Sequence, residues 1–341
     1  MSVIPKTMRA SVLTKAKTLE IQERPLPKLS PDEVLIQVAS VGVCGSDVQF
    51  YEEGRLSDWI VTEPLVLGHE ASGTIVAVGA DIASERIGER VAIEPQRPSI
   101  TSDETRRGAY NLDPAMEFYA VPGVDGAFQE FVTIQSHFAF AIPDSISFDA
   151  AALAEPLSVA IATAQKAEFT IGQRIFIAGA GPIGLITAQV ARAYGAREII
   201  VSDISDKRLE AALENGATSV MNAAQESPAG LEADAFVDAS GAEKAVHSGI
   251  NAVRPGGHAV LVGMGPADMK LPVSTIMNKE ILLTGVFRYA NTWPTAINLL
   301  ADGIVKLDSL VTGHFGLEQV GAALESTHLP DTLKSIVVPS G

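Results

Sequence analysis

Two short stretches in the first half of the chain carry side chains that can do chemistry. The stretch "VGVCGSDVQFY" contains Cys44, and the stretch "LVLGHEASG" contains His69 and Glu70. Thiolate, imidazole and carboxylate groups are the ligands that bind zinc in proteins. Neighbouring residues of a regular strand point to opposite faces, so His69 and Glu70 can share a metal only if the chain turns there, as Gly68 favours. The spacing alone is a weak metal signature, and a buried structural thiol is the alternative role for Cys44.

Two further residues are candidates for moving a proton in this region. Ser46 follows Cys44 closely, and Glu155 stands in "LAEPLSV". A hydroxyl or carboxylate that reaches a bound water can carry a proton away from a reacting group. Each residue also has a structural alternative. Ser46 can bond its own backbone in a turn, and Glu155 can stabilise a helix start before Pro156.

The second half opens on the glycine pattern "FIAGAGPIG", with Gly179, Gly181 and Gly184 in G-x-G-x-x-G spacing. The β-branched run before it predicts a buried strand, and the apolar periodicity after it predicts a helix that begins near Pro182 and Ile183. The first glycine permits the tight turn, the second lets the backbone approach a pyrophosphate, and the third lets helix and strand pack closely. We therefore expect a dinucleotide at this turn, with a ligand-free packing turn as the alternative.

The residue that ends the following predicted strand, "REIIVSD", selects the cofactor. A carboxylate at Asp203 can accept hydrogen bonds from the adenosine ribose hydroxyls and would repel a 2′-phosphate, so NAD is favoured over NADP. Arg208, on the predicted helix that follows, is included among the cofactor-binding residues. It either lines the adenine side or softens the preference for NAD.

The elements that must position these residues fall into two classes, and the length of 341 residues suggests two domains. Alternating strand and helix patterns over residues 157–287 predict a doubly wound parallel sheet. The first half has short strand-like runs such as "DEVLIQVASVG" and "SGTIVAVG", broken by proline and glycine, and predicts a β-rich domain. The fold class is therefore α/β with a second, β-rich part.

Composition excludes several classes of partner. The formal net charge of −16 argues against nucleic acid and against anionic membrane surfaces. No stretch has the apolar length of a signal peptide core or a membrane span, and a single cysteine permits no intramolecular disulfide. We expect a cytoplasmic protein that acts on a small molecule.

The sequence resembles the zinc-dependent medium-chain dehydrogenases/reductases over nearly its whole length, through "GHEASGTIVAVG". More narrowly it is similar to the sorbitol and xylitol dehydrogenases, through "CGSDV", "YNL", "EPLSVAI", "GAGPIG" and "GVFRYANTWP". The resemblance implies a GroES-like catalytic domain over residues 1–156 and 288–341, and a Rossmann domain that binds NAD over residues 157–287. It also implies a homotetramer.

The resemblance assigns roles to residues of this sequence. The implied zinc ligands are Cys44, His69 and Glu70, with Glu155 either binding zinc or holding a zinc-bound water. The implied contacts to the polyol are Phe50, Tyr51, Glu155, Arg288 and Tyr289. The implied surroundings of the nicotinamide and its ribose are Val262, Gly263, Met264, Val286, Phe287 and Arg288. The implied reaction oxidises a secondary hydroxyl of a sugar alcohol to a ketone, with hydride transfer to NAD and one catalytic zinc per chain.

The sequence departs from this family pattern in two places. Phe50 stands where animal sorbitol dehydrogenases have a tyrosine, with Tyr51 next to it. Many relatives hold a structural zinc on four cysteines, and the matching positions here are Ser99, Ser102, Thr105 and Asp113. Hydroxyl and carboxylate oxygens do not make a structural zinc site, so we expect none in this lobe.

Two other functions remain open at this stage. One is a different zinc dehydrogenase, acting on threonine or a simple secondary alcohol. The other is a catalytically inactive NAD-binding or structural relative. Retention of Cys44, His69 and Glu70 argues against the inactive protein, and "FRYANTWP" argues against a simple alcohol because that substrate needs no additional hydroxyl contacts.

Overall fold

The computed structural model describes residues 4–340, which form two compact units. One unit contains the chain up to Glu155 and resumes at Trp293, and the other contains Pro156–Thr292. Residues 288–292, which the sequence analysis assigned to the catalytic domain, group with the second unit. No helix among the described residues is long and apolar enough to cross a membrane.

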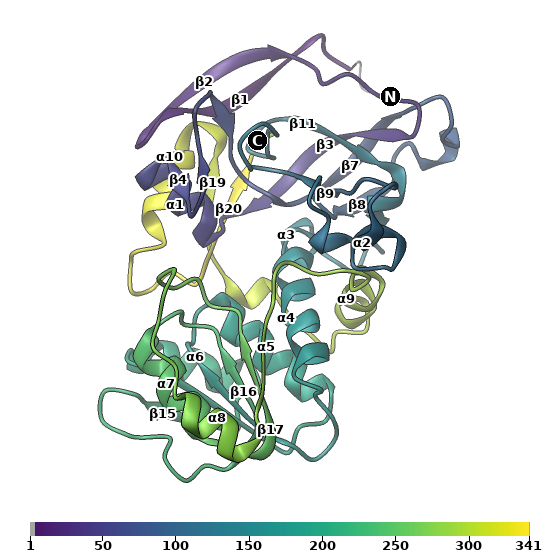
Figure 1. Ribbon diagram of the computed structural model, residues 1–341. Coiled ribbons are helices and arrows are strands. Elements are labelled where there is room, and N and C mark those ends of the chain that lie inside the picture. The colour runs from purple at the N-terminus through teal and green to yellow at the C-terminus, as the bar shows by residue number, and fades with distance from the viewer. Residues whose placement is uncertain (1–3, 341) are drawn as a thin grey trace. The chain divides into compact units, whose positions relative to one another are not determined.

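The first unit is built around a seven-stranded sheet (Figure 1). Its strand order is β12 (Ala139–Ala141), β8 (Arg90–Ile93), β7 (Glu70–Val78), β3 (Glu33–Gly42), β20 (Lys334–Val338) and β19 (Val311–Gly316), with β11 (Phe131–Gln135) also on β3. All of these pairs are antiparallel except β19 with β20. A three-stranded sheet has the order β2 (Thr18–Pro25), β1 (Thr7–Lys15) and β6 (Leu65–Val66). The β-rich first half expected from the sequence is therefore confirmed.

Shorter elements complete the first unit. Two-stranded ladders join β4 (Arg55–Leu56) to β5 (Trp59–Ile60) and β9 (Gln96–Arg97) to β10 (Glu117–Phe118). The helices are α1 (Gly45–Glu53), α2 (Asp103–Arg106), α3 (Phe148–Ala152), α9 (Trp293–Ala301) and α10 (Val320–Ser326). The sequence analysis did not identify α1, which begins directly after Cys44. Its apolar face is short, with Val48, Phe50 and Tyr51 buried.

The last strand brings the C-terminal segment back into the first unit. β20 pairs with β3 through Ile336 opposite Gly42 and Val337 opposite Val41. Both strands have near-continuous apolar runs, which suits strands buried on both faces. This pairing places Lys334, the first residue of β20, beside the end of β3.

The second unit is a six-stranded parallel sheet (Figure 1). Its order is β15 (Ser219–Asn222), β14 (Glu198–Asp203), β13 (Arg174–Ala178), β16 (Ala233–Asp238), β17 (Val253–Leu261) and β18 (Leu282–Gly285). The helices are α5 (Pro182–Ala193), α6 (Asp206–Glu214), α7 (Glu243–Asn251) and α8 (Val273–Lys279), and α4 (Ala154–Lys166) begins at the unit boundary. The strand order continues from β13 in both directions, and the general right-handedness of such crossovers puts α5 and α6 on one face and α7 and α8 on the other. The doubly wound sheet expected from the sequence is confirmed.

Candidate metal centre and cofactor site

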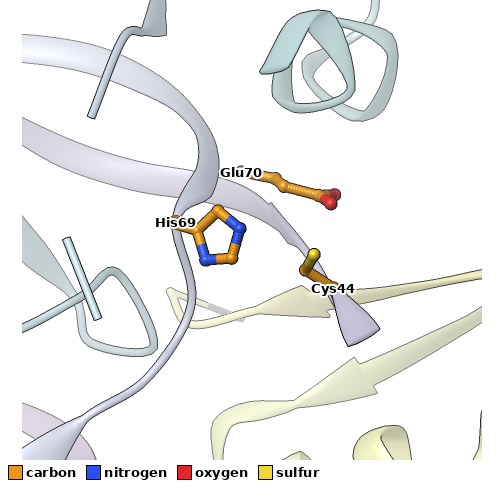
Figure 2. Close-up of side chains that lie close together, drawn as sticks. All are labelled: Cys44, His69 and Glu70. Carbon is orange, nitrogen blue, oxygen red and sulfur yellow. The ribbon is translucent and has the colours of Figure 1, made fainter. Parts of the chain in front are cut away.

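Cys44, His69 and Glu70 converge in the first unit (Figure 2). One ligand atom from each of them lies within 4.8 Å of the others. Cys44 is the N-cap residue of α1, and His69 and Glu70 stand at the entry to β7. Gly68 has φ of +88°, the left-handed conformation that turns the chain there. The turn that the sequence required for adjacent ligands is therefore present.

Two glycines make room for these side chains. A Cβ at Gly42 would lie 2.0 Å from Glu70 Oε2, so the carboxylate occupies the space above that glycine. A Cβ at Gly68 would lie 2.8 Å from the ring of Phe128, which packs beneath the turn. A side chain at Gly42 would displace the Glu70 carboxylate, and one at Gly68 would meet the Phe128 ring from a left-handed backbone, so both glycines preserve the arrangement of the cluster.

Asp47 orients the cluster from α1. Its buried carboxylate accepts hydrogen bonds from the amides of Cys44 (3.1 Å) and Gly68 (2.9 Å). It also lies 3.5 Å from His69 Nδ1, which leaves Nε2 available to a metal. Burial lowers the pKa of His69, but the charges of Asp47 and Cys44 outweigh burial and raise that pKa well above its ordinary value. Sequence reasoning assigned no role to Asp47, although it is part of the "CGSDV" match.

Lys334 reaches the cluster from β20. Its buried ammonium donates to Glu70 Oε1 at 2.6 Å and to the carbonyl of Val43 at 2.7 Å. Burial lowers the pKa of Lys334, yet Glu70 foremost and then Cys44 raise it above the ordinary value. A buried carboxylate without a cation would be costly, so this ion pair makes the Glu70 position tenable. Sequence reasoning missed Lys334 because no local signal marks a partner so distant along the chain.

The residues at this site fit a zinc ion. Within the part of the chain that the structure describes, Glu70 Oε2 is buried and has no hydrogen-bond partner. An unsatisfied carboxylate oxygen in a dry site is expensive unless it faces a cation or a donor. Sulfur, nitrogen and oxygen from Cys44, His69 and Glu70 are the mixed donor set that zinc accepts.

Glu155 and Ser46, the two candidate proton carriers, are not part of this three-residue cluster. In residues 4–340, the cluster of possible metal ligands ends with Cys44, His69 and Glu70 and does not include Glu155. Glu155 is buried in the first turn of α4. Ser46 is half-buried in the first turn of α1. The structure therefore assembles a three-residue cluster, and a role for Glu155 in binding zinc or a zinc-bound water stays a prediction.

The charge of Glu155 acts on a second buried acid. Glu94 is 1% exposed and accepts hydrogen bonds from Tyr110 Oη (2.7 Å) and Gln96 Nε2 (3.0 Å). Burial, with the negative charge of Glu155 as a smaller contribution, raises the pKa of Glu94 to about 8 against these two hydrogen bonds. Sequence reasoning did not single out Glu94.

Phe50 and Tyr51, assigned to the polyol by resemblance, belong to the hydrophobic core of the first unit. The hydroxyl of Tyr51 donates to Glu325 Oε1 at 3.1 Å, which ties α1 to α10. Burial and the neighbouring Glu325 raise the pKa of Tyr51. The structure thus gives this hydroxyl a partner within the protein.

The glycine turn of the second unit has the predicted form. Gly179 has φ of +105°, and a Cβ at Gly184 would lie 1.9 Å from the carbonyl oxygen of Gly179. A Cβ at Gly181, the N-cap of α5, would meet nothing within 4 Å among the described atoms. Gly179 and Gly184 are thus required by the protein itself, whereas the space at Gly181 suits a ligand phosphate. Pro182 and Ile183 begin the first turn of α5, where backbone amides other than that of Pro182, which has no N–H, can bind an anion.

Asp203 ends β14 beside this turn. Its Oδ2 accepts the amide of Ala180 at 2.8 Å, and its Oδ1 accepts the amide of Ser205 at 3.0 Å. Each carboxylate oxygen keeps a further lone pair for a ribose hydroxyl. Arg208 lies in the first turn of α6, which follows directly.

The remaining cofactor candidates lie at or beyond the ends of β17 and β18. Val262 and Gly263 follow β17, and both amides donate to the carbonyl of Asp238 at 2.9 Å. The side chains of Met264 and Phe287 are exposed. Val286 follows β18, and its amide donates to Leu261 O at 2.9 Å.

Arg288 and Tyr289 come next in the chain. Arg288 has φ of +56°, and its guanidinium lies 4.7 Å from the centre of the Phe287 ring. Tyr289 is 1% exposed. Both residues belong to the second unit.

The lobe at residues 95–114 is organised around Asp113. Its Oδ2 accepts the amide of Ser99 at 2.6 Å and the hydroxyl of Thr105 at 3.3 Å, and its Oδ1 accepts the amide of Ala115 at 2.9 Å. Burial raises the pKa of Asp113. The hydrogen bonds above and one from Ser102 outweigh burial, so the pKa of Asp113 lies below its ordinary value. The four positions that match cysteines in relatives are thus joined by hydrogen bonds around one carboxylate.

Comparison with known proteins places this geometry in context. Residues 30–144 match the model of the alcohol dehydrogenase GroES-like domain, and residues 182–302 match that of the zinc-binding dehydrogenase. Sorbitol dehydrogenase of Gallus gallus is 39% identical over 95% of this chain and 94% of its own. Sorbitol dehydrogenase of Bacillus subtilis is 40% identical over 99% of both chains.

Solved structures of dehydrogenases superpose on this chain over nearly its whole length. L-idonate 5-dehydrogenase from Escherichia coli superposes with a TM-score of 0.93 at 28% identity over 98% of both chains. An alcohol dehydrogenase from Escherichia coli CFT073, solved with NADH, has a TM-score of 0.91 at 28% identity, over 98% of this chain and 100% of its own.

Proposed function

The chain belongs to the polyol dehydrogenases of the zinc-dependent medium-chain dehydrogenase/reductase family, and we propose that it oxidises a secondary hydroxyl of an open-chain sugar alcohol to the ketose with NAD. The single observation that carries the proposal is the cluster of half-buried Cys44 with buried His69 and Glu70, in which one carboxylate oxygen of Glu70 is unsatisfied. An inactive relative has no need of such a cluster.

Cys44 Sγ, His69 Nε2 and Glu70 Oε2 would hold the zinc, which polarises a substrate hydroxyl and makes its proton easier to lose. NAD supplies the hydride acceptor. The chain's own residues set up this chemistry. Asp47 fixes the imidazole, and Lys334 balances the charge of Glu70. We propose Glu155 and Ser46 as the residues that carry the released proton to solvent through water.

We propose that Arg288 and Tyr289 provide the polar contacts that a polyol needs and a simple alcohol does not. A panel of sorbitol, xylitol, threonine and a simple secondary alcohol, with reduction of NAD followed by absorbance, separates the candidates. Highest kcat/KM on the polyols is the expected result. Turnover of threonine or the simple alcohol alone would replace the proposal by another zinc dehydrogenase, and no turnover of any would favour the inactive relative.

We propose that the cofactor is NAD rather than NADP, because Asp203 presents a carboxylate where the adenosine ribose would lie. Replacing Asp203 with Ser removes the repulsion of a 2′-phosphate. The NAD/NADP ratio of kcat/KM should fall by at least about tenfold, or roughly 1.4 kcal/mol. If the wild-type protein has a kcat/KM with NADP equal to or higher than that with NAD, this preference is refuted.

We propose one zinc per chain, held at the Cys44 cluster. The lobe at residues 95–114 has no cysteine or histidine to make a second site. Elemental analysis of dialysed protein should give about one zinc per chain, and Cys44→Ser should bring it close to zero because a hydroxyl is a poor zinc ligand. Ser46→Ala is a matched control that should keep its zinc. Two tightly held zincs in the wild type would contradict the proposal.

We further propose a cytoplasmic homotetramer. In a reducing compartment the thiol of Cys44 is protected from oxidation. For assembly, β18 pairs only with β17 within the described chain, and its Leu282 is exposed, so this edge of the sheet is open to another copy. Sedimentation equilibrium tests the assembly, and a monomer at micromolar concentration would exclude it.

A further inference from the structure

A buried carboxylate without an assigned role lies at the carboxyl edge of the six-stranded sheet. Asp238 ends β16 and is 1% exposed. Its Oδ1 accepts hydrogen bonds from Ser240 N (3.0 Å), Ser240 Oγ (2.7 Å) and Gly241 N (3.1 Å), and its Oδ2 lies 3.2 Å from Gly241 N. Hydrogen bonds to a carboxylate are stronger than neutral ones. Asp238 therefore fixes the turn formed by residues 239–241.

This turn touches the loop after β17 backbone to backbone. A Cβ at Gly263 would lie 2.2 Å from Gly241 N and 2.9 Å from Asp238 Oδ2. A Cβ at Gly241 would lie 2.1 Å from Met264 O, and one at Gly265 would lie 2.2 Å from Gly241 O. The turn and the loop thus pack with no space for a methyl group between them, so a shift of the turn must displace the loop of residues 262–265.

The strand order shows which half of a dinucleotide this loop would face. The order reverses at β13, which is followed by the glycine turn, with β14 on one side and β16 and β17 on the other. A dinucleotide lies across such a reversal point. If Asp203 at the end of β14 receives the adenosine ribose, the nicotinamide half extends towards β16 and β17.

We propose that Asp238 is a positioning residue for the nicotinamide half of the cofactor, acting through the 239–241 turn on the 262–265 loop. The inference rests on the proposed NAD function and deepens it. Asp238 is buried behind that loop, so its influence is exerted through the two backbones.

The adenine half should be largely independent of Asp238. The amide of Ala239 donates to the carbonyl of Ala178 at 2.8 Å, which ties this chain segment to β13 without using the carboxylate. The amide of Gly179 donates to Ser202 O at 2.7 Å, and Asp203 accepts the amide of Ala180. The pyrophosphate turn thus keeps its own hydrogen bonds when Asp238 is removed.

The test compares two ligands on the full-length, zinc-loaded protein. NADH contains the nicotinamide and ADP-ribose lacks it, so their dissociation constants separate the two halves of the site. Asp238→Ala leaves the buried amide of Gly241 and the amide of Ser240 without their acceptor. It should weaken NADH by about tenfold or more, with ADP-ribose changed less than about threefold. Asp238→Asn keeps one acceptor oxygen and should give a smaller loss in the same direction.

Asp234→Asn is the matched control, because Asp234 lies near the other end of β16 and also accepts a backbone amide, from Arg174 at 2.7 Å. It should leave both dissociation constants unchanged, even where it lowers the melting temperature. Equal weakening of both ligands in Asp238→Ala, or no change in NADH binding in a folded variant, overturns the inference. If Asp238→Ala does not fold, Asp238→Asn and Ser240→Ala provide the same comparison. Wild-type protein that fails to bind NADH would instead refute the proposed cofactor.

Discussion

At the residue scale, the candidate zinc cluster is a balance of buried charges. Cys44 and Glu70 contribute acidic groups, and Lys334 contributes the cation that lies 2.6 Å from Glu70. Asp47 takes no part in that ion pair and instead holds the amides of Cys44 and Gly68. Each ligand therefore depends on a neighbour that binds no metal itself.

The Lys334–Glu70 pair leads to a prediction about stability with and without metal. Lys334→Met leaves the Glu70 carboxylate buried without its cation, which should lower the free energy of unfolding of metal-free protein by about 3–5 kcal/mol. A zinc ion can take over the role of the missing cation. The rise in melting temperature on adding zinc should therefore be larger in Lys334→Met than in the wild type, as measured by differential scanning calorimetry.

A lysine in the second unit provides the control for this comparison. Lys279 donates to the carbonyls of Asn251 (3.1 Å) and Val253 (2.6 Å), so Lys279→Met also removes a cation that caps backbone groups. In Lys279→Met, the rise in melting temperature on adding zinc should equal that of the wild type. An equal rise in Lys334→Met and in the wild type would show that the ion pair and the metal are not coupled.

At the element scale, the lobe at residues 95–114 is organised by hydrogen bonds to the carboxylate of Asp113. α2 and the 3-10 helix η2 (Tyr110–Leu112) pack together, and Asp113 accepts hydrogen bonds from Ser99 and Thr105. The hydroxyl of Tyr110 also binds Glu94, which follows β8. The lobe is thus closed by hydrogen bonds to carboxylates.

Asp113→Asn tests this account of the lobe. The variant loses the charge that strengthens several hydrogen bonds, so the free energy of unfolding should fall by about 1–2 kcal/mol near neutral pH. Because folding lowers the pKa of Asp113, its stabilisation is present above the ordinary aspartate pKa and is lost as pH falls through the folded value. The difference between wild type and variant should therefore shrink in acid. A difference independent of pH, measured by denaturant unfolding, would exclude the charge as its origin.

Local patterns made part of this architecture predictable. The glycine turn, α5 and β14 follow from spacing and periodicity within a short segment, and Gly179 and Gly184 have the backbone constraints expected of them. Lys334 was missed as the partner of Glu70 because strand pairing brings it there from far along the chain. Tyr110 was missed as the partner of Glu94 because the packing of the lobe brings the two together. A one-turn apolar face is too short to identify α1 from its sequence.

At the scale of the whole molecule, the candidate sites for zinc and for the dinucleotide lie in different units. The metal cluster lies in the unit that contains β3, β7 and β20, and the glycine turn lies in Pro156–Thr292. A ligand that binds only the folded state stabilises it by an amount that depends on its concentration relative to Kd. Each ligand should therefore act first on its own unit.

Hydrogen exchange measured by mass spectrometry can resolve the two effects. Removing zinc with a chelator should increase exchange in α1, β7 and β20, because Glu70 loses the cation that its free oxygen requires. Adding NADH at about 100 times its Kd contributes about 2.7 kcal/mol to the folded state and should slow exchange in α5 and at the ends of β14 and β16. The chelator should leave hydrogen exchange in the second unit unchanged. NADH should slow exchange in that unit even in Cys44→Ser. Equal loss of protection in both units on chelation would show instead that the molecule opens as a single cooperative body, with the metal stabilising all of it.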